Sequence, residues 1–184
     1  MKKTLILIAS VSLIILALAW KISECGGSDR WDVKVLTDKE AALVKYKPRI
    51  TTIKKLVALI TPLVHGNTPR MKMEMQVYKV ECNIVEYIKE DDKDYHLVIT
   101  DKDDTMIAEI PDADCPDAQK SKHHKEFAEA RSTFELARKD KSYKKHRWRI
   151  YGVAFVDIKH GTPPKGCPAN RIELHPVLKM EVIK

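Results

Sequence analysis

The sequence lacks the short motifs that identify many small enzymes. No G-x-S-x-G, P-loop or G-x-G-x-x-G pattern occurs, so hydrolase and nucleotide-binding functions have none of their usual anchors. No C-x-x-C spacing occurs, which argues against a zinc ribbon or a thioredoxin-like motif. The acidic residues 101–104 lack the Gly and Glu spacing of an EF-hand. We therefore expect no cofactor and no metal, and we favour a protein that is not an enzyme.

Charge of one sign does not dominate the sequence either. The formal net charge of +7 becomes +5 if Lys2 and Lys3 are removed, and acids alternate with bases over most of the chain. Such a mixed surface mainly favours solubility, with a weak attraction to polyanions. The basic cluster is residues 141–149 (KSYKKHRWR), which could be a polyanion contact or the solvated start of a strand. The length of 184 residues suits one domain, for which we expect a monomer.

The first 19 residues follow the plan of a secretory signal peptide. Two lysines precede an apolar run that ends in Ala17-Leu18-Ala19, the small-x-small pattern of a signal-peptidase site before Trp20. The alternatives are an uncleaved membrane anchor over residues 4–20 and a lipoprotein modified at Cys25. We expect an exported protein, periplasmic or extracellular, that contacts the membrane only if this segment stays uncleaved.

Export makes the four cysteines candidates for disulfide bonds, and four cysteines allow three pairings. Cys115 and Cys167 both lie in proline-rich loops, whereas Cys82 falls inside a strand pattern. A small thiol in such a strand is usually a buried apolar group. The pattern predicts a Cys115–Cys167 disulfide and a buried, reduced Cys82.

Hydrophobic periodicity predicts the secondary structure of the C-terminal part of the chain. Alternation of apolar and polar residues predicts strands, and a phase slip at Ile84-Val85 indicates a bulge in the first of them. Apolar residues spaced three and four apart predict a helix over residues 121–140. The expected strands cover residues 78–87, 95–100, 105–110, 146–157 and 171–183. This β-β-β-α-β-β order predicts a five-stranded OB-like barrel with one long helix; another small α+β sheet is the alternative.

The N-terminal part is less regular. Residues 28–38 read as an extended lead-in, residues 39–44 as a helical turn, and residues 51–63 as a short amphipathic helix capped by Thr51 or Thr52. We therefore divide the chain into a signal peptide (1–19), an N-terminal extension (20–74) and a barrel domain (75–184).

Several segments form long, specific motifs. They are residues 51–53 (TTI), 94–99 (DYHLVI), 105–111 (TMIAEIP), 152–161 (GVAFVDIKHG) and 170–178 (NRIELHPVL). Together they resemble a family of exported bacterial proteins of uncharacterised function, over a stretch from about residue 32 to the C-terminus. The resemblance implies export and the barrel architecture, not a mechanism. This chain departs from the family's HG-x-x-G-x-A-P-N-G run, and Arg171 stands where that run has a glycine.

Candidate binding residues gather near the last two expected strands. Glu173 and His175 are two apart on a strand and should share a face, with the loop after the preceding strand folding back beside them. They could bind a ligand or a metal, or form an ion pair while the loop residues make capping hydrogen bonds. His96 and Glu109 form a second candidate pair, for which a solvent-facing cross-strand contact is the simplest interpretation. The full candidate set is His96, Glu109, Asp157, His160, Asn170, Glu173 and His175.

Two functions compete. The first is an exported β-barrel binding module for an extracellular polymer, such as a polyanion, or a protein partner. The second is a small secreted metal-dependent hydrolase, such as a phosphodiesterase or nuclease, built on the polar residues near the last strands. Convergence of the candidate histidines and carboxylates on one point would favour the second.

Overall fold

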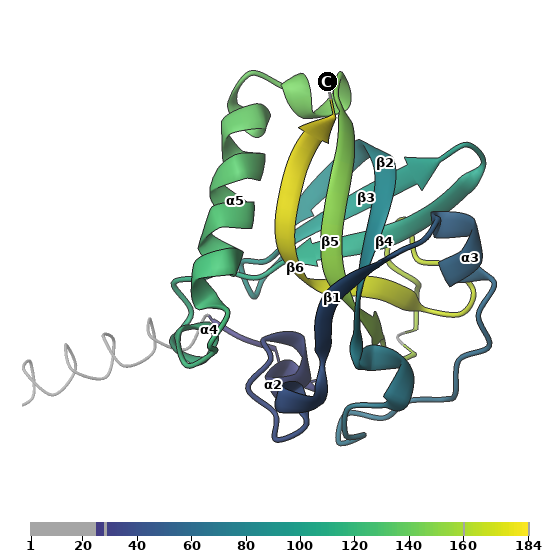
Figure 1. Ribbon diagram of the computed structural model, residues 1–184, viewed down its shortest axis with the longest axis vertical. Coiled ribbons are helices and arrows are strands. Elements are labelled where there is room, and N and C mark those ends of the chain that lie inside the picture. The colour runs from purple at the N-terminus through teal and green to yellow at the C-terminus, as the bar shows by residue number, and fades with distance from the viewer. Residues whose placement is uncertain (1–24, 28, 160, 184) are drawn as a thin grey trace, which may run out of the picture.

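The structure is a computed structural model that describes residues 25–27, 29–159 and 161–183. The expected signal peptide and His160 lie outside the described residues. The chain is mainly β, with a mixed sheet and few helices (Figure 1). The strands are β1 (Lys45–Ile50), β2 (Gln76–Lys89), β3 (Tyr95–Asp101), β4 (Asp104–Ile110), β5 (Arg147–Val156) and β6 (Ile172–Ile183). The helices are α2 (Trp31–Lys34), α3 (Ile53–Val57), α4 (Pro116–Gln119) and α5 (His124–Lys139), with 3₁₀ turns η1 (Ala41–Leu43), η2 (Lys72–Glu74) and η3 (Ser142–Lys144).

The sheet closes on itself through five of its strands. Its order is β1-β2-β3-β4-β6-β5, and β5 also pairs with β2, so β2, β3, β4, β6 and β5 form a ring. Within the ring, β4 and β6 are parallel and the other neighbours are antiparallel. The predicted strand and helix order from residue 75 onward is confirmed.

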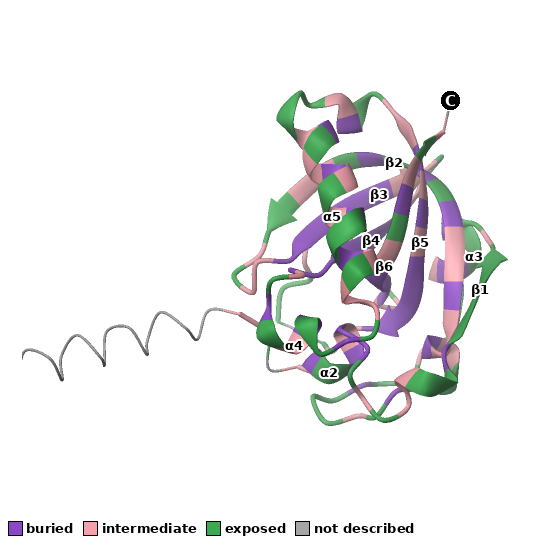
Figure 2. Ribbon diagram, turned by 60° about the vertical axis from the view of Figure 1, so that its left-hand side comes forward, coloured by how far each residue is buried: buried purple, intermediate pink, exposed green. Residues whose placement is uncertain are grey.

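A bend in β2 allows this one strand to serve two neighbours. Its first half pairs with β5 and its second half with β3, and the register shifts between Ile84 and Glu86. The predicted bulge is therefore confirmed, and its physical role is to turn the strand and help to close the ring. Apolar side chains from all five ring strands fill the interior, with Trp148 and Ile84 among the fully buried ones. Figure 2 shows buried residues along the ring strands.

Helix α5 lies beside β6 and covers the core (Figure 1). Its predicted apolar face is buried, and Phe134 contacts the rings of Tyr87, Tyr95 and Tyr143 edge-on. Such edge-to-face contacts add to the stabilisation from burial. Within the described part of the chain, no helix is both long and apolar enough to cross a membrane.

The N-terminal segment differs from its prediction in three places. Residues 31–34 are helical (α2) rather than extended, because burial of Trp31 and Val33 stabilises the turn. Strand β1, which pairs in parallel with β2, has every residue exposed and contains Pro48, so no alternation revealed it. Helix α3 begins after Thr52, whose side chain accepts a hydrogen bond from the Lys55 amide as an N-cap. It is shorter than the helix predicted over residues 51–63.

A buried ion pair fixes α2 against the end of β5. Arg30 donates to both carboxylate oxygens of Glu74, at 2.9 and 2.5 Å, and to the carbonyl of Val156 at 2.8 Å. Glu74 in turn accepts a hydrogen bond from the Val156 amide. These contacts connect elements far apart in the sequence, and they hold Lys34, at the end of α2, near the carboxyl end of β5.

The disulfide bond joins Cys25 to Cys115, with their Cα atoms 5.6 Å apart. The predicted Cys115–Cys167 pairing is therefore wrong, because the segment before α2 returns to the loop ahead of α4. Cys167 is a free, partly exposed thiol. The prediction that Cys82 is buried and reduced is confirmed.

Candidate functional site

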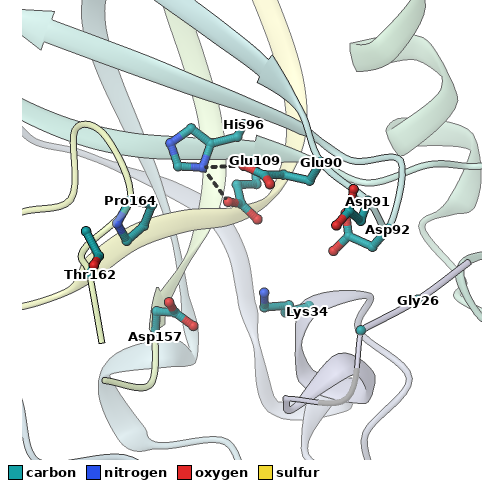
Figure 3. A pocket seen from close by; sticks show the side chains of 11 residues that line it. Gly26, Lys34, Glu90, Asp91, Asp92, His96, Glu109, Asp157, Thr162 and Pro164 are labelled. Carbon is teal, nitrogen blue, oxygen red and sulfur yellow. Dashed lines mark hydrogen bonds and ion pairs between the residues drawn. The ribbon is translucent and has the colours of Figure 1, made fainter. Parts of the chain in front are cut away.

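A cavity of about 590 Å³ opens over the face of β3 and β4 (Figure 3). One wall is the β2–β3 loop, another is the loop that follows β5, and a third is the segment around α2. His96 from β3 and Glu109 from β4 lie between these walls. The lining residues are Gly26, Gly27, Lys34, Glu90, Asp91, Asp92, His96, Glu109, Asp157, Thr162 and Pro164.

His96 and Glu109 are directly opposite each other on β3 and β4. Nδ1 of His96 lies 2.9 Å from Oε1 of Glu109, and Nε2 donates a hydrogen bond of 2.9 Å to the carbonyl of Lys165. Burial alone would lower the pKa of His96, but the hydrogen bond and charge of Glu109 raise it to about 9. The predicted cross-strand contact is confirmed. Its expected exposure is wrong, because the loop after β5 and the α2 segment cover this face.

Glu109 contacts a second histidine beneath the cavity. Its Oε2 lies 2.8 Å from Nδ1 of His175, and Oε1 of Glu173 lies 3.2 Å from the same nitrogen. His175 and Glu173 share a face of β6, as predicted from their spacing, and both are buried. Despite the penalty of burial, the neighbouring carboxylates raise the pKa of His175 well above its usual value. Burial opposes ionisation of Glu173, and with the charge of Glu109 it raises the pKa of that carboxyl to about 7.

Asp94 completes this buried group. It precedes β3, and its Oδ1 accepts a hydrogen bond of 2.7 Å from the Asp112 amide. Its Oδ2 lies 3.5 Å from Nε2 of His175. Burial raises the pKa of the Asp94 carboxyl to about 6, although His175 acts in the opposite direction. One donor atom each from Asp94, Glu109 and His175 lie within 4.8 Å of one another, which is the spacing of a possible metal site.

Lys34 and Asp157 reach the cavity from the side opposite His96 (Figure 3). Burial would lower the pKa of Lys34, but the charges of Glu109, Glu173 and other nearby carboxylates raise it above its usual value. The Lys34 ammonium also lies 5.5 Å from the centre of the Phe155 ring. Lys34 therefore stays charged at neutral pH and partly offsets the negative charge of the cavity.

The cavity carries more acidic than basic groups. Among the lining residues that the structure describes, five are carboxylates and two, Lys34 and His96, are cationic groups. No arginine, tryptophan, tyrosine or phenylalanine is among the described lining residues. A cavity of this composition attracts cations by charge and offers no aromatic platform for stacking.

The seven candidates from the sequence do not all meet. His96, Glu109 and Asp157 line the cavity, and Glu173 and His175 lie just beneath it. Asn170 is elsewhere: its side-chain amide donates to the carbonyls of Leu56 and Leu59 at the end of α3. Its role is the structural capping that was one of the two interpretations. His160 lies outside the described residues.

Two residues of the site were missed in the sequence. Asp94 stood in the DYHLVI motif, but it was not singled out because it precedes the strand and belongs to an acidic turn. Lys34 was missed because nothing local indicates that α2 packs beside the carboxyl end of β5. The sequence signal that could have identified Asp94 was its position two residues before His96. The sequence contains no comparable signal for Lys34.

The basic cluster at 141–149 spans η3 and the start of β5. Two of its arginines already have acidic partners: Arg147 lies 2.7 Å from Asp101, and Arg149 lies 2.7 Å from Glu81. These ion pairs reduce the positive charge available to an external polyanion.

Comparisons with known proteins give no family assignment. No protein-family model matches the chain, and no curated protein matches it. Among the solved structures that are distantly similar to this chain, two are tRNA synthetases. A protein described as an aspartyl-tRNA synthetase from Leishmania major Friedlin shares 12% identity over 92% of this chain, with a TM-score of 0.39. An asparaginyl-tRNA synthetase from Entamoeba histolytica shares 12% identity over 68%, with a TM-score of 0.37. The matches span only 26% and 24% of those chains.

Proposed function

We propose that this protein is an exported binding module of the OB class, whose ligand occupies the cavity over β3 and β4. The ring order β2-β3-β4-β6-β5 supports the OB assignment. So does helix α5, which lies in the chain between β4 and β5, the third and fourth ring strands in sequence order. Export is supported by the sequence of residues 1–19, and the Cys25–Cys115 disulfide is compatible with it.

The position of the cavity is the observation that carries this proposal. OB folds bind ligands on the face of their second and third strands, between the loop joining strands 1 and 2 and the loop joining strands 4 and 5. The corresponding parts here are β3 and β4, residues 90–94 and residues 157–171. The cavity is lined by all three of them.

The charge of the cavity supports a ligand with a cationic group. A nucleic-acid backbone would bring phosphates next to Glu90, Asp91 and Asp92, which is electrostatically unfavourable. An amine would instead find several carboxylates at short range. The proposed ligand is a cationic group of an extracellular polymer or protein partner.

Two probes of opposite charge test this proposal. Spermidine and a heparin oligosaccharide are titrated separately into ¹⁵N-labelled protein, and amide shifts are mapped. Spermidine should shift the amides of Gly27, Asp91 and Thr162, and heparin should not. Asp91→Asn should weaken spermidine binding, whereas Asp103→Asn, at an exposed position in the β3–β4 turn, should not. Heparin shifts at the cavity, or no spermidine shifts there, would contradict the proposal.

The second candidate is a secreted metal-dependent hydrolase, such as a phosphodiesterase. The buried donor set of Asp94, Glu109 and His175 favours it, because a metal held there could activate water. Hydrolysis of bis(p-nitrophenyl) phosphate by the exported protein with added Zn²⁺ or Mn²⁺ would support this candidate. Activity that persists in His175→Gln would come from a contaminant.

A further inference from the structure

Two buried polar atoms face each other without making a hydrogen bond. They are Oδ2 of Asp94 and Nε2 of His175, and both residues have no solvent exposure. The two atoms lie 3.5 Å apart. Buried polar atoms nearly always have a hydrogen-bond partner, so a facing pair without one needs a physical explanation.

The other polar atom of each side chain, Oδ1 of Asp94 and Nδ1 of His175, is held by neighbouring groups. Asp94 accepts the Asp112 amide hydrogen bond through Oδ1, which leaves Oδ2 directed at His175. The Nδ1 atom of His175 lies against Glu109 and Glu173, which leaves Nε2 directed at Asp94. A histidine that donates one ring N–H to a carboxylate and presents the other nitrogen is the usual arrangement of a metal-ligating histidine.

The distance between the two atoms is informative. A charge-assisted N–H···O hydrogen bond is about 2.7–2.9 Å long, so 3.5 Å is long for a histidinium–aspartate contact. Two ligands of a tetrahedral ion with bonds of about 2.1 Å are separated by about 3.4 Å. The gap between Asp94 and His175 therefore matches the separation of two ligands of one ion, which would displace the His175 proton on binding.

We propose that a divalent transition-metal ion of the zinc type binds between Nε2 of His175 and Oδ2 of Asp94. Glu109, whose Oε2 lies 2.8 Å from Nδ1 of His175, holds the ring from the other side and keeps Nε2 directed at the ion. A mixed imidazole and carboxylate set suits zinc and its neighbours better than calcium or magnesium. The ion lies beneath the cavity floor, and Glu109 connects it to His96.

This inference goes beyond the proposed binding function, because the ion binds whether or not the cavity accepts a cationic ligand. It also specifies the metal site on which the second candidate function rests. Zinc binding with no spermidine shifts would leave this inference standing and overturn the proposed function. Spermidine shifts in protein that binds no zinc would do the reverse.

Calorimetry with zinc chloride tests the site. The exported protein is treated with EDTA, dialysed and titrated, and we expect one zinc ion per chain. Asp94→Asn removes the charge of a direct ligand and should weaken the affinity by more than the about tenfold that loss of an outer, supporting carboxylate commonly costs. Asp103→Asn and His65→Gln change exposed residues and should leave the affinity unchanged. Absence of zinc binding, or equal affinity in Asp94→Asn, would overturn the proposal.

A measurement on the unaltered protein covers the case in which Asp94→Asn does not fold. In a long-range ¹H–¹⁵N spectrum of the histidine rings, zinc should shift the Nε2 resonance of His175 and leave that of His65 in place. If only surface histidines such as His123 and His124 respond, zinc binds adventitiously and the proposal is wrong. Co²⁺ in place of zinc should give the visible absorption of a tetrahedral site.

Discussion

Glu109 lies directly opposite His96 on the neighbouring strand, and its Oε1 is 2.9 Å from Nδ1 of that histidine. The other oxygen of Glu109 contacts His175, so one carboxylate serves two imidazoles. These charges hold the pKa of Glu109 well below its usual value, although burial acts in the opposite direction. Glu109 is thus the shared negative charge that stabilises the protonated forms of His96 and His175.

Replacement of Glu109 should destabilise the protein strongly. Glu109→Gln keeps the shape of the side chain but leaves His96 and His175 without their shared counter-charge. Breaking a buried ion pair in this way costs about 3–5 kcal/mol of unfolding free energy. Urea unfolding in the presence of EDTA measures the loss. Glu81→Gln removes the carboxylate of the exposed ion pair with Arg149 and should change stability little. Equal stability of the two variants would contradict the prediction.

The strands and α5 were predictable because their patterns are local. Alternation from Tyr78 onward and the slip at Ile84-Val85 depend only on which side of one strand faces the core. β1 gave no such pattern, since all of its side chains are exposed and backbone pairing with β2 holds it.

The site was predictable only in part, for a related reason. Strand parity placed Glu173 with His175 and suggested the cross-strand pair of His96 and Glu109. The alternation of side chains along a strand does not indicate which face of the sheet a distant segment covers. The burial of His96 and Glu109 was therefore not predicted. The same limit explains why Lys34 was overlooked and why Cys115 was paired with the wrong cysteine.

Thiol chemistry tests the observed disulfide. Peptide mapping without reduction should recover a peptide linking Cys25 to Cys115. Iodoacetamide should modify the partly exposed Cys167 and leave Cys82 unmodified until the protein is unfolded, because burial raises the pKa of Cys82 to about 12. A Cys115–Cys167 peptide would contradict the structure.

Loss of the disulfide should also lower stability. Cys115→Ser releases a link between residues 90 apart in the sequence, and loss of such a bond typically costs about 2–5 kcal/mol. Cys167→Ser is the matched control, since it changes a free thiol. Urea unfolding of both variants should show a loss for the first alone.

Export should remove the first 19 residues. Mass spectrometry of the protein recovered outside the cytoplasm should give an N-terminus at Trp20. Replacing Ala17 and Ala19 with bulky residues should prevent cleavage and retain the chain at the membrane. A mature protein that still carries Met1 would support the uncleaved anchor instead.

The stability of the EDTA-treated protein should depend on the protonation of His96. The pKa of this side chain is raised from 6.5 to about 9, because Glu109 and the Lys165 carbonyl hold its proton despite burial. Below pH 6.5 the folded and unfolded chains both carry the proton, and the stabilisation is fully present. As the pH rises towards 9, the unfolded chain loses the proton first, so the stabilisation is lost.

Comparison with His96→Gln isolates this effect from other titrating groups. The difference in unfolding free energy between the original protein and His96→Gln should be largest near pH 6 and should shrink as the pH approaches 9. His65→Gln, at an exposed loop position, controls for the general effect of losing a histidine. Urea unfolding at closely spaced pH values provides the measurement. A difference that stays constant across this range would mean that His96 stabilises the fold by packing and not as an imidazolium between Glu109 and Lys165.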